Sequence, residues 1–105
     1  MEIRVATDLD GSFGHRTIPE APQKPVMCIS GRTYNEYDEK AKQIACQMPL
    51  YIRHIGAYGD RRAAAEFKAT MIKLMKITHF IEDDLFQSQI IHKLCPGVVL
   101  CIAQP

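Results

Sequence analysis

Short apolar segments alternate along the chain with longer segments that carry a helical pattern of apolar residues. The apolar runs cover residues 2–7, 25–29, 50–55, 78–82 and 98–102, and the helical patterns cover residues 34–46, 61–76 and 84–94. Runs of this length predict buried strands, whereas the longer periodic segments predict helices. Alternation with short connections predicts an α/β fold with a mainly parallel, five-stranded sheet. Because crossovers between parallel strands are right-handed, we expect a doubly wound, Rossmann-like three-layer sandwich.

Two segments carry more specific expectations. In residues 34–46, the side chains of Tyr34, Tyr37, Ala41, Ile44 and Ala45 fall on one helical face, which predicts packing of that face on the sheet. In residues 50–55 the alternation of side chains predicts an edge strand with Arg53 directed to solvent.

The segment between the first two strands predicts a loop. Residues 11–24, GSFGHRTIPEAPQK, are rich in Gly and Pro and have no periodicity. They are too few for a folded cap domain, and the 105 residues suffice for one domain with one core. We therefore expect a single domain over residues 1–105, with no cap.

Composition and net charge point to no particular partner, and a local basic patch remains compatible with them. The chain is 47% hydrophobic and 24% charged, as in ordinary globular proteins, and its formal net charge of +1 gives no global attraction for nucleic acid or anionic membranes. The first residues, MEIRVATD, are too short and too polar to predict a signal peptide, and no apolar run approaches the roughly 20 residues that span a bilayer. Four cysteines without metal-ligand spacing predict buried free thiols. These features predict a cytoplasmic protein without a membrane partner.

The first predicted strand ends in an acidic motif, Asp8-Leu9-Asp10-Gly11-Ser12. Two carboxylates two positions apart can converge on one cation, and the following Gly allows the chain to turn sharply. A solvated acidic turn is the alternative interpretation of these residues.

Two further strand ends carry polar residues. Ser30-Gly31-Arg32 follows the second strand and offers a hydroxyl and flexible backbone amides, which suit an oxyanion, although a simple turn and helix cap explains them as well. Glu82-Asp83-Asp84 ends the fourth strand. Adjacent carboxylates repel one another unless a cation offsets them, so they indicate the second half of a metal site. The alternative is that Asp84 caps the next helix.

Lys68 is the polar exception on an apolar helical face. At 100° per residue it falls among Ala64, Phe67, Met71 and Ile72, whereas Lys73 points away. A lysine in such a stripe either extends its ammonium group outward to solvent or meets an anion.

Four features of the chain, in this order, resemble the four motifs of haloacid dehalogenase-like (HAD) hydrolases. They are the motif at Asp8 to Ser12, the strand ending at Ser30, the helical Lys68, and the acidic strand end at Asp83 and Asp84. The set spans nearly the whole chain. The stretch from Gly59 through Lys68 to Asp84 is also similar to the phosphatase domain of phage polynucleotide kinase-phosphatases. Lys73 stays open as an alternative to Lys68, because the interval from Lys68 to the acidic end is short.

This resemblance implies a Mg²⁺-dependent phosphatase with a covalent intermediate. Asp8 is then the nucleophile that forms an aspartyl-phosphate, and Asp10 is the general acid and then the general base. Mg²⁺ is then held by Asp8, the backbone carbonyl of Asp10 and Asp83, with Asp84 bound through water.

The resemblance also implies how phosphate is held and which substrates fit. Ser30, Gly31 and Lys68 are then the phosphate-binding residues. Without a cap the site is open, which implies a bulky or macromolecular phosphoester such as a nucleic-acid end, or a homo-oligomer in which a neighbouring chain covers the cleft.

Two rival functions share parts of this pattern. A receiver-like regulatory module also combines acids, Mg²⁺ and a lysine, but its phosphorylated aspartate follows the third strand, where His54 stands here, and its lysine follows the fifth, where Gln104 stands. A HAD-fold regulatory module with a degenerate site is the other rival, and the presence of both Asp8 and Asp10 disfavours it.

Overall fold

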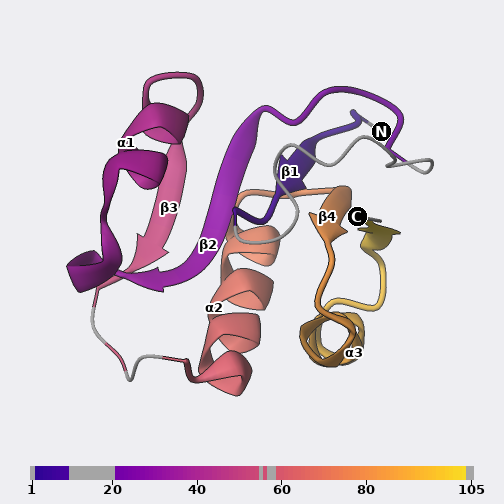
Figure 1. The fold of residues 1–105 in the computed structure, drawn as a ribbon. Coiled ribbons are helices and arrows are strands. Elements are labelled where there is room, and N and C mark those ends of the chain that lie inside the picture. Colours follow the sequence, from indigo (N-terminus) through magenta and orange to yellow (C-terminus); the bar gives the residue numbers. More distant parts are fainter. Residues whose placement is uncertain (1, 10–20, 55, 57–58, 104–105) are drawn as a thin grey trace.

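The computed structural model describes residues 2–9, 21–54, 56 and 59–103. Strands and helices alternate from the second strand onward (Figure 1). The elements are β1 (Val5–Thr7), β2 (Met27–Thr33), a short 3₁₀ helix (η1, Tyr34–Glu36), α1 (Glu39–Ala45), β3 (Leu50–Arg53), α2 (Arg61–Leu74), β4 (His79–Glu82), α3 (Leu85–Leu94) and β5 (Val99–Ile102).

The five strands form one sheet in the order β3-β2-β1-β4-β5, and every neighbouring pair is parallel. The predicted parallel five-stranded sheet is thereby confirmed. From β1 the chain moves outward to β2 and β3, and the connection through α2 then carries it across to β4 and β5 (Figure 1). The strand order therefore reverses between β1 and β4, whose carboxyl ends lie at the same edge of the sheet.

The larger part of the core lies between the sheet and the helices α2 and α3. Ala6, Met27, Ile29 and Phe80 from three adjacent strands are all buried there, with the apolar residues of the two helices. Because side chains alternate along a strand, the residues between these positions face the other side of the sheet.

Two smaller clusters occupy that other side. Cys28 packs there with Leu50 of β3 and with Ala41 and Ile44 of α1. Val5, Ile81, Cys101 and Ala103 form the second cluster. Helix α1 thus packs against the residues that alternate with those facing α2, which agrees with the strand periodicity of the sequence.

The prediction of a single helix over residues 34–46 is wrong for residues 34–38, because α1 begins only at Glu39. Asp38 is the residue before α1, and its carboxylate accepts from the backbone N–H of Ala41 at 3.0 Å, so that it starts the helix there. Tyr34 and Tyr37, expected on the packed face, are 67% and 39% exposed. The local cap decides the start of the helix, and the two tyrosines lie ahead of it.

The second strand is longer than expected, and Arg53 does not face solvent. The apolar run at 25–29 predicted an end before Ser30, but β2 includes Ser30 and Gly31, and its register against β3 shifts over this stretch. Arg53 is 8% exposed, and its Nε donates to the carbonyl oxygen of Gly31 at 2.7 Å. This contact lies where the pairing of β2 with β3 is irregular, so a side chain supplies a hydrogen bond to the strand backbone there.

Within the described residues, no helix is both long and apolar enough to cross a bilayer. All four cysteines are free thiols; Cys28, Cys95 and Cys101 are buried as expected, whereas Cys46 is exposed.

Candidate functional site

Asp8 lies at the point where the strand order reverses. Its backbone N–H donates to the carbonyl oxygen of Ile81 at 2.9 Å, which extends the pairing of β1 with β4 one residue beyond β1. Asp8 is 3% exposed. In open parallel sheets such a switch point, beyond the carboxyl ends of the strands, is the usual place of a ligand site.

Lys68 of α2 reaches into this switch point and is 2% exposed. Its Nζ lies 3.0 Å from Oδ1 of Asp8. The same nitrogen donates to Oε1 of Glu82 and to Oε1 of Gln87, each at 2.7 Å. An ammonium group has three N–H donors, so three acceptors satisfy it. Lys73, the sequence alternative, is exposed, so the lysine that meets the acidic strand ends is Lys68.

Glu82 was noticed in the sequence only as part of the acidic strand end, and no individual role was predicted for it. Its side chain is fully buried at the end of β4, with Oε1 facing Lys68. Its Oε2 accepts from the backbone N–H groups of Asp83 at 3.1 Å and Asp84 at 3.2 Å. Strand periodicity offered a signal, because Glu82 shares a face with the core residue Phe80.

The charges of these buried groups act on one another. Burial by itself lowers the pKa of Lys68, but the carboxylates of Asp8 and Glu82 raise it more, so its pKa lies above the usual value and the ammonium stays charged. Burial, and then repulsion from Asp8, raises the pKa of Glu82 to about 8, although Lys68 and the backbone amides act in the opposite direction.

Three carboxylates at this edge can hold a cation together. Asp8, Glu82 and Asp83 each offer one carboxylate oxygen, and these three oxygens lie within 4.8 Å of one another. Carboxylate oxygens are the ligands that Mg²⁺ prefers, so this donor set fits a divalent cation. A bound cation would also offset the repulsion from Asp8 that raises the pKa of Glu82.

Asp84 lies beside this group but is engaged elsewhere. It precedes α3, and its side chain accepts from the backbone N–H of Gln87. Arg61 binds it with two hydrogen bonds, from Nε at 2.9 Å and from Nη2 at 2.7 Å. The Arg61 hydrogen bond is the main reason that the pKa of Asp84 falls to about 2. Of the two acids expected at the metal, Asp83 joins the carboxylate group and Asp84 pairs with Arg61.

Of the expected phosphate-binding residues, Gly31 lines the cleft at this edge and Ser30 is fully buried within β2. The hydroxyl oxygen of Ser30 accepts from the backbone N–H of Arg32 at 3.1 Å. A Cβ atom added at Gly31 would lie 2.3 Å from the Cβ of Ala64 on α2, so close packing of strand and helix requires glycine here. Asp10, the expected general acid, lies outside the described residues, as do positions 11–20 of the predicted loop.

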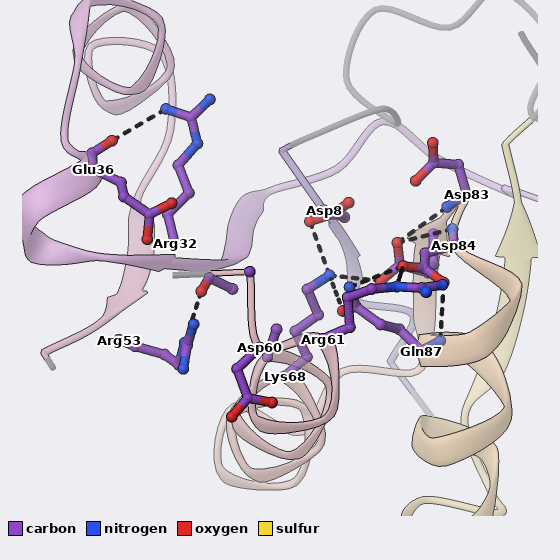
Figure 2. Close-up of a pocket in the computed structure, with 14 residues that line it drawn as sticks. Asp8, Arg32, Glu36, Arg53, Asp60, Arg61, Lys68, Asp83, Asp84 and Gln87 are labelled. Atoms are coloured by element: carbon purple, nitrogen blue, oxygen red, sulfur yellow. Dashed lines mark hydrogen bonds and ion pairs between the residues drawn. The ribbon is translucent and has the colours of Figure 1, made fainter. Parts of the chain in front are cut away.

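The cleft has a volume of about 270 Å³ and opens at the carboxyl edge of the sheet. Its wall contains Asp8, Lys68 and the acidic strand end, together with Arg32, Arg53 and Arg61. The arginines were not predicted as site residues. In Figure 2, Arg32 and Arg53 lie toward β2 and β3, whereas Arg61 extends toward Asp84 on the side of the acids.

Comparisons with protein-family models, with curated proteins and with solved structures gave no significant match.

Proposed function

We propose that this chain is a Mg²⁺-dependent phosphohydrolase of the HAD-like type, with the doubly wound layering of that fold. The observation that carries the proposal is the contact of Lys68 with Asp8 and Glu82, beside Asp83, at the carboxyl ends of β1 and β4. A buried ammonium among clustered carboxylates at a strand-order switch point supports a site that handles phosphoryl groups.

Asp8 is the nucleophile in this proposal. One of its carboxylate oxygens attacks phosphorus, and the bond between phosphorus and the ester oxygen breaks. Asp10 protonates the departing alkoxide. In the second step Asp10 removes a proton from water, which attacks the phosphorus of the aspartyl-phosphate and releases inorganic phosphate and the free Asp8 carboxylate.

Lys68 holds the phosphoryl oxygens and balances the charge of Asp8. Its burial supports this role, because an ammonium removed from water acts on neighbouring charges more strongly than an exposed one. Glu82 and Gln87 keep the ammonium in place through their hydrogen bonds to Nζ. Gly31 lines the cleft, and in this proposal it holds the phosphate together with Ser30, which is buried beside it in β2.

The carboxylates of Asp8 and Asp83, with the carbonyl of Asp10, would hold Mg²⁺, and Asp84 would assist through water. When bound, the cation supplies positive charge that brings the anionic nucleophile and the anionic phosphate together. Glu82 lies in the same group of carboxylates, and its ion pair with Lys68 sets how much of the ammonium's charge is offset. The free thiols of the cysteines support a cytoplasmic location.

The deciding experiment is detection of the phosphoenzyme. The wild type is incubated with Mg²⁺ and p-nitrophenyl phosphate, quenched rapidly, digested and analysed by mass spectrometry. Added phosphate on the peptide that contains Asp8 supports the proposal, and the Asp8→Asn variant should lack it. The Asp10→Asn variant should still become phosphorylated, because p-nitrophenolate leaves without being protonated, and should turn over about 10² to 10⁴-fold more slowly.

Other outcomes of this experiment point to different functions. A phosphoenzyme on Asp8 that forms but does not release phosphate indicates a receiver-like switch. Turnover retained by Asp8→Asn contradicts covalent catalysis by this residue. Screening phosphomonoesters and oligonucleotides with a 3′ or 5′ phosphate then identifies the substrate class.

A further inference from the structure

Among the residues that the structure describes, four cationic side chains line the cleft, and they differ in how far solvent reaches them. Lys68 and Arg53 are 2% and 8% exposed. The side chain of Arg32 is 14% exposed and is bound to Asp38 at 2.7 Å. The side chain of Arg61 is 58% exposed. Of these four, Arg61 is the cation that a ligand entering the cleft can reach most readily.

Arg61 is also held in a fixed orientation. Its guanidinium makes two hydrogen bonds to Asp84 and lies 4.8 Å from the ring centroid of Phe86. Asp84 in turn accepts from Nε2 of Gln87 at 3.1 Å, and Gln87 contacts Lys68. A chain of contacts therefore joins the exposed arginine to the buried lysine, which reduces the entropy lost when both bind one ligand.

The guanidinium keeps donors for a ligand. It carries five N–H groups, and the pair with Asp84 uses one on Nε and one on Nη2. Within the described part of the chain, Nη1 donates to no group. Planar guanidinium groups bind phosphate oxygens through parallel hydrogen bonds, which an ammonium cannot do.

We propose that Arg61 binds a second phosphate of the substrate while the phosphate to be cleaved lies at Asp8 and Lys68. This inference rests on the proposed function and narrows it to phosphoesters that carry a further phosphate near the scissile one. The cleft volume of about 270 Å³ agrees, because it is small for a whole ligand and admits only the phosphate-bearing end.

Binding of phosphonates tests this without turnover, because their carbon–phosphorus bonds are not phosphoesters. Isothermal titration calorimetry of the wild type in Mg²⁺ compares the affinity for propylphosphonate with that for propane-1,3-bisphosphonate. Bisphosphonates with ethane and butane spacers test other separations of the two phosphonate groups. The second phosphonate should improve the affinity about tenfold for the best spacer, as one charge-assisted contact does. Arg61→Ala should abolish that gain, and Arg61→Lys should retain part of it.

Arg62→Ala is the matched control. Its guanidinium lies 5.8 Å from the same Phe86 ring, but Arg62 lines a separate groove between α2 and α3 and not the cleft. This variant should keep the full gain. A gain that survives in Arg61→Ala, a gain lost equally in Arg62→Ala, or a wild type that prefers no bisphosphonate overturns the inference.

A double variant separates loss of the arginine from exposure of its partner. Arg61→Ala leaves the Asp84 carboxylate unpaired, and that charge could itself repel the second phosphonate. Arg61→Ala/Asp84→Asn removes the repulsion and should still lack the gain, whereas recovery of the gain would overturn a direct contact. Thermal unfolding of every variant checks that each is folded.

One further ligand identifies the source of the second phosphate. The monomethyl ester of one phosphonate carries the single charge of a nucleic-acid phosphodiester. A gain that persists with this ester supports a nucleic-acid backbone, and a gain confined to the free bisphosphonate supports a terminal phosphate. These titrations need no turnover. If the protein hydrolyses no phosphomonoester, that finding contradicts the proposed function, but the binding measurements still test the role of Arg61.

Discussion

The ammonium nitrogen of Lys68 lies 3.0 Å from Oδ1 of Asp8, and the two side chains are only 2% and 4% exposed. Little water reaches either group at that depth, so each charge is stabilised by the other, and the ammonium also by Glu82. The pair also connects α2 to the end of β1, and it therefore contributes both to the stability of the fold and to the chemistry of the cleft.

Replacement of Lys68 by Met should destabilise the protein and abolish phosphatase activity. The variant leaves Asp8 and Glu82 without their cation, and removal of one partner of a buried ion pair costs about 3–5 kcal/mol. Urea unfolding measures the cost, and turnover of p-nitrophenyl phosphate measures activity. Lys73→Met is the control: this exposed lysine should change the unfolding free energy by less than about 0.5 kcal/mol. An inactive Lys73→Met with an active Lys68→Met would mean that the other lysine serves the site.

Mg²⁺ should bind the folded protein and raise its unfolding free energy. A ligand at a hundredfold excess over its Kd stabilises by about 2.7 kcal/mol, which urea unfolding at increasing Mg²⁺ concentration can measure. Asp83→Asn removes one of the three grouped carboxylates and should weaken this effect, whereas Glu39→Gln, at an exposed position of α1, should not. Turnover should cease in EDTA. Equal stabilisation of Asp83→Asn, or full activity after metal stripping, would contradict the metal site.

Gly31→Ala should strain the contact between β2 and α2. The added Cβ meets the Cβ of Ala64 at 2.3 Å, and overpacking of this kind costs about 1–3 kcal/mol. Ala64→Gly removes the obstacle, although glycine inside a helix itself costs about 1 kcal/mol. The double variant should therefore be more stable than the sum of the single effects predicts, as measured by urea unfolding. Additive losses would show that Gly31 is required for another reason.

Acid should remove the contribution of Asp84 to stability. Its pKa is lowered from 3.8 to about 2, chiefly by Arg61, so the folded state favours the ionised form. Its stabilising contribution is therefore present above pH 3.8 and is lost as the pH falls toward about 2. Asp84→Asn retains a residue that caps helices well but loses the charge. The difference in unfolding free energy between wild type and variant should be largest near neutral pH and should decrease as the pH falls from 3.8 through about 2; a constant difference would contradict this account.

The sequence by itself determined the strands and the two longer helices, and it indicated Lys68 as the buried lysine while Lys73 stayed open as an alternative. Apolar runs and helical periodicity are local properties, and the parallel sheet follows from their alternation. Lys68 was visible because it interrupts an apolar face, and α2 does bury it. The residues at the ends of β1 and β4 were also predictable, since parallel strands place their carboxyl ends at one edge.

The tertiary structure alone decided which partner each acid of the strand end has: Glu82 pairs with Lys68, and Asp84 pairs with Arg61. Strand periodicity puts Glu82 on the face of Phe80, but only the packing of α2 on that face brings Lys68 to Glu82. Asp84 pairs with Arg61 because α2 and α3 begin close together, a proximity that no local pattern encodes. Arg53 is buried for the same kind of reason: its partner is a carbonyl oxygen of the neighbouring strand, exposed by a shift in register. Contacts between distant segments depend on how the elements pack, and charged side chains then follow the partners that packing supplies.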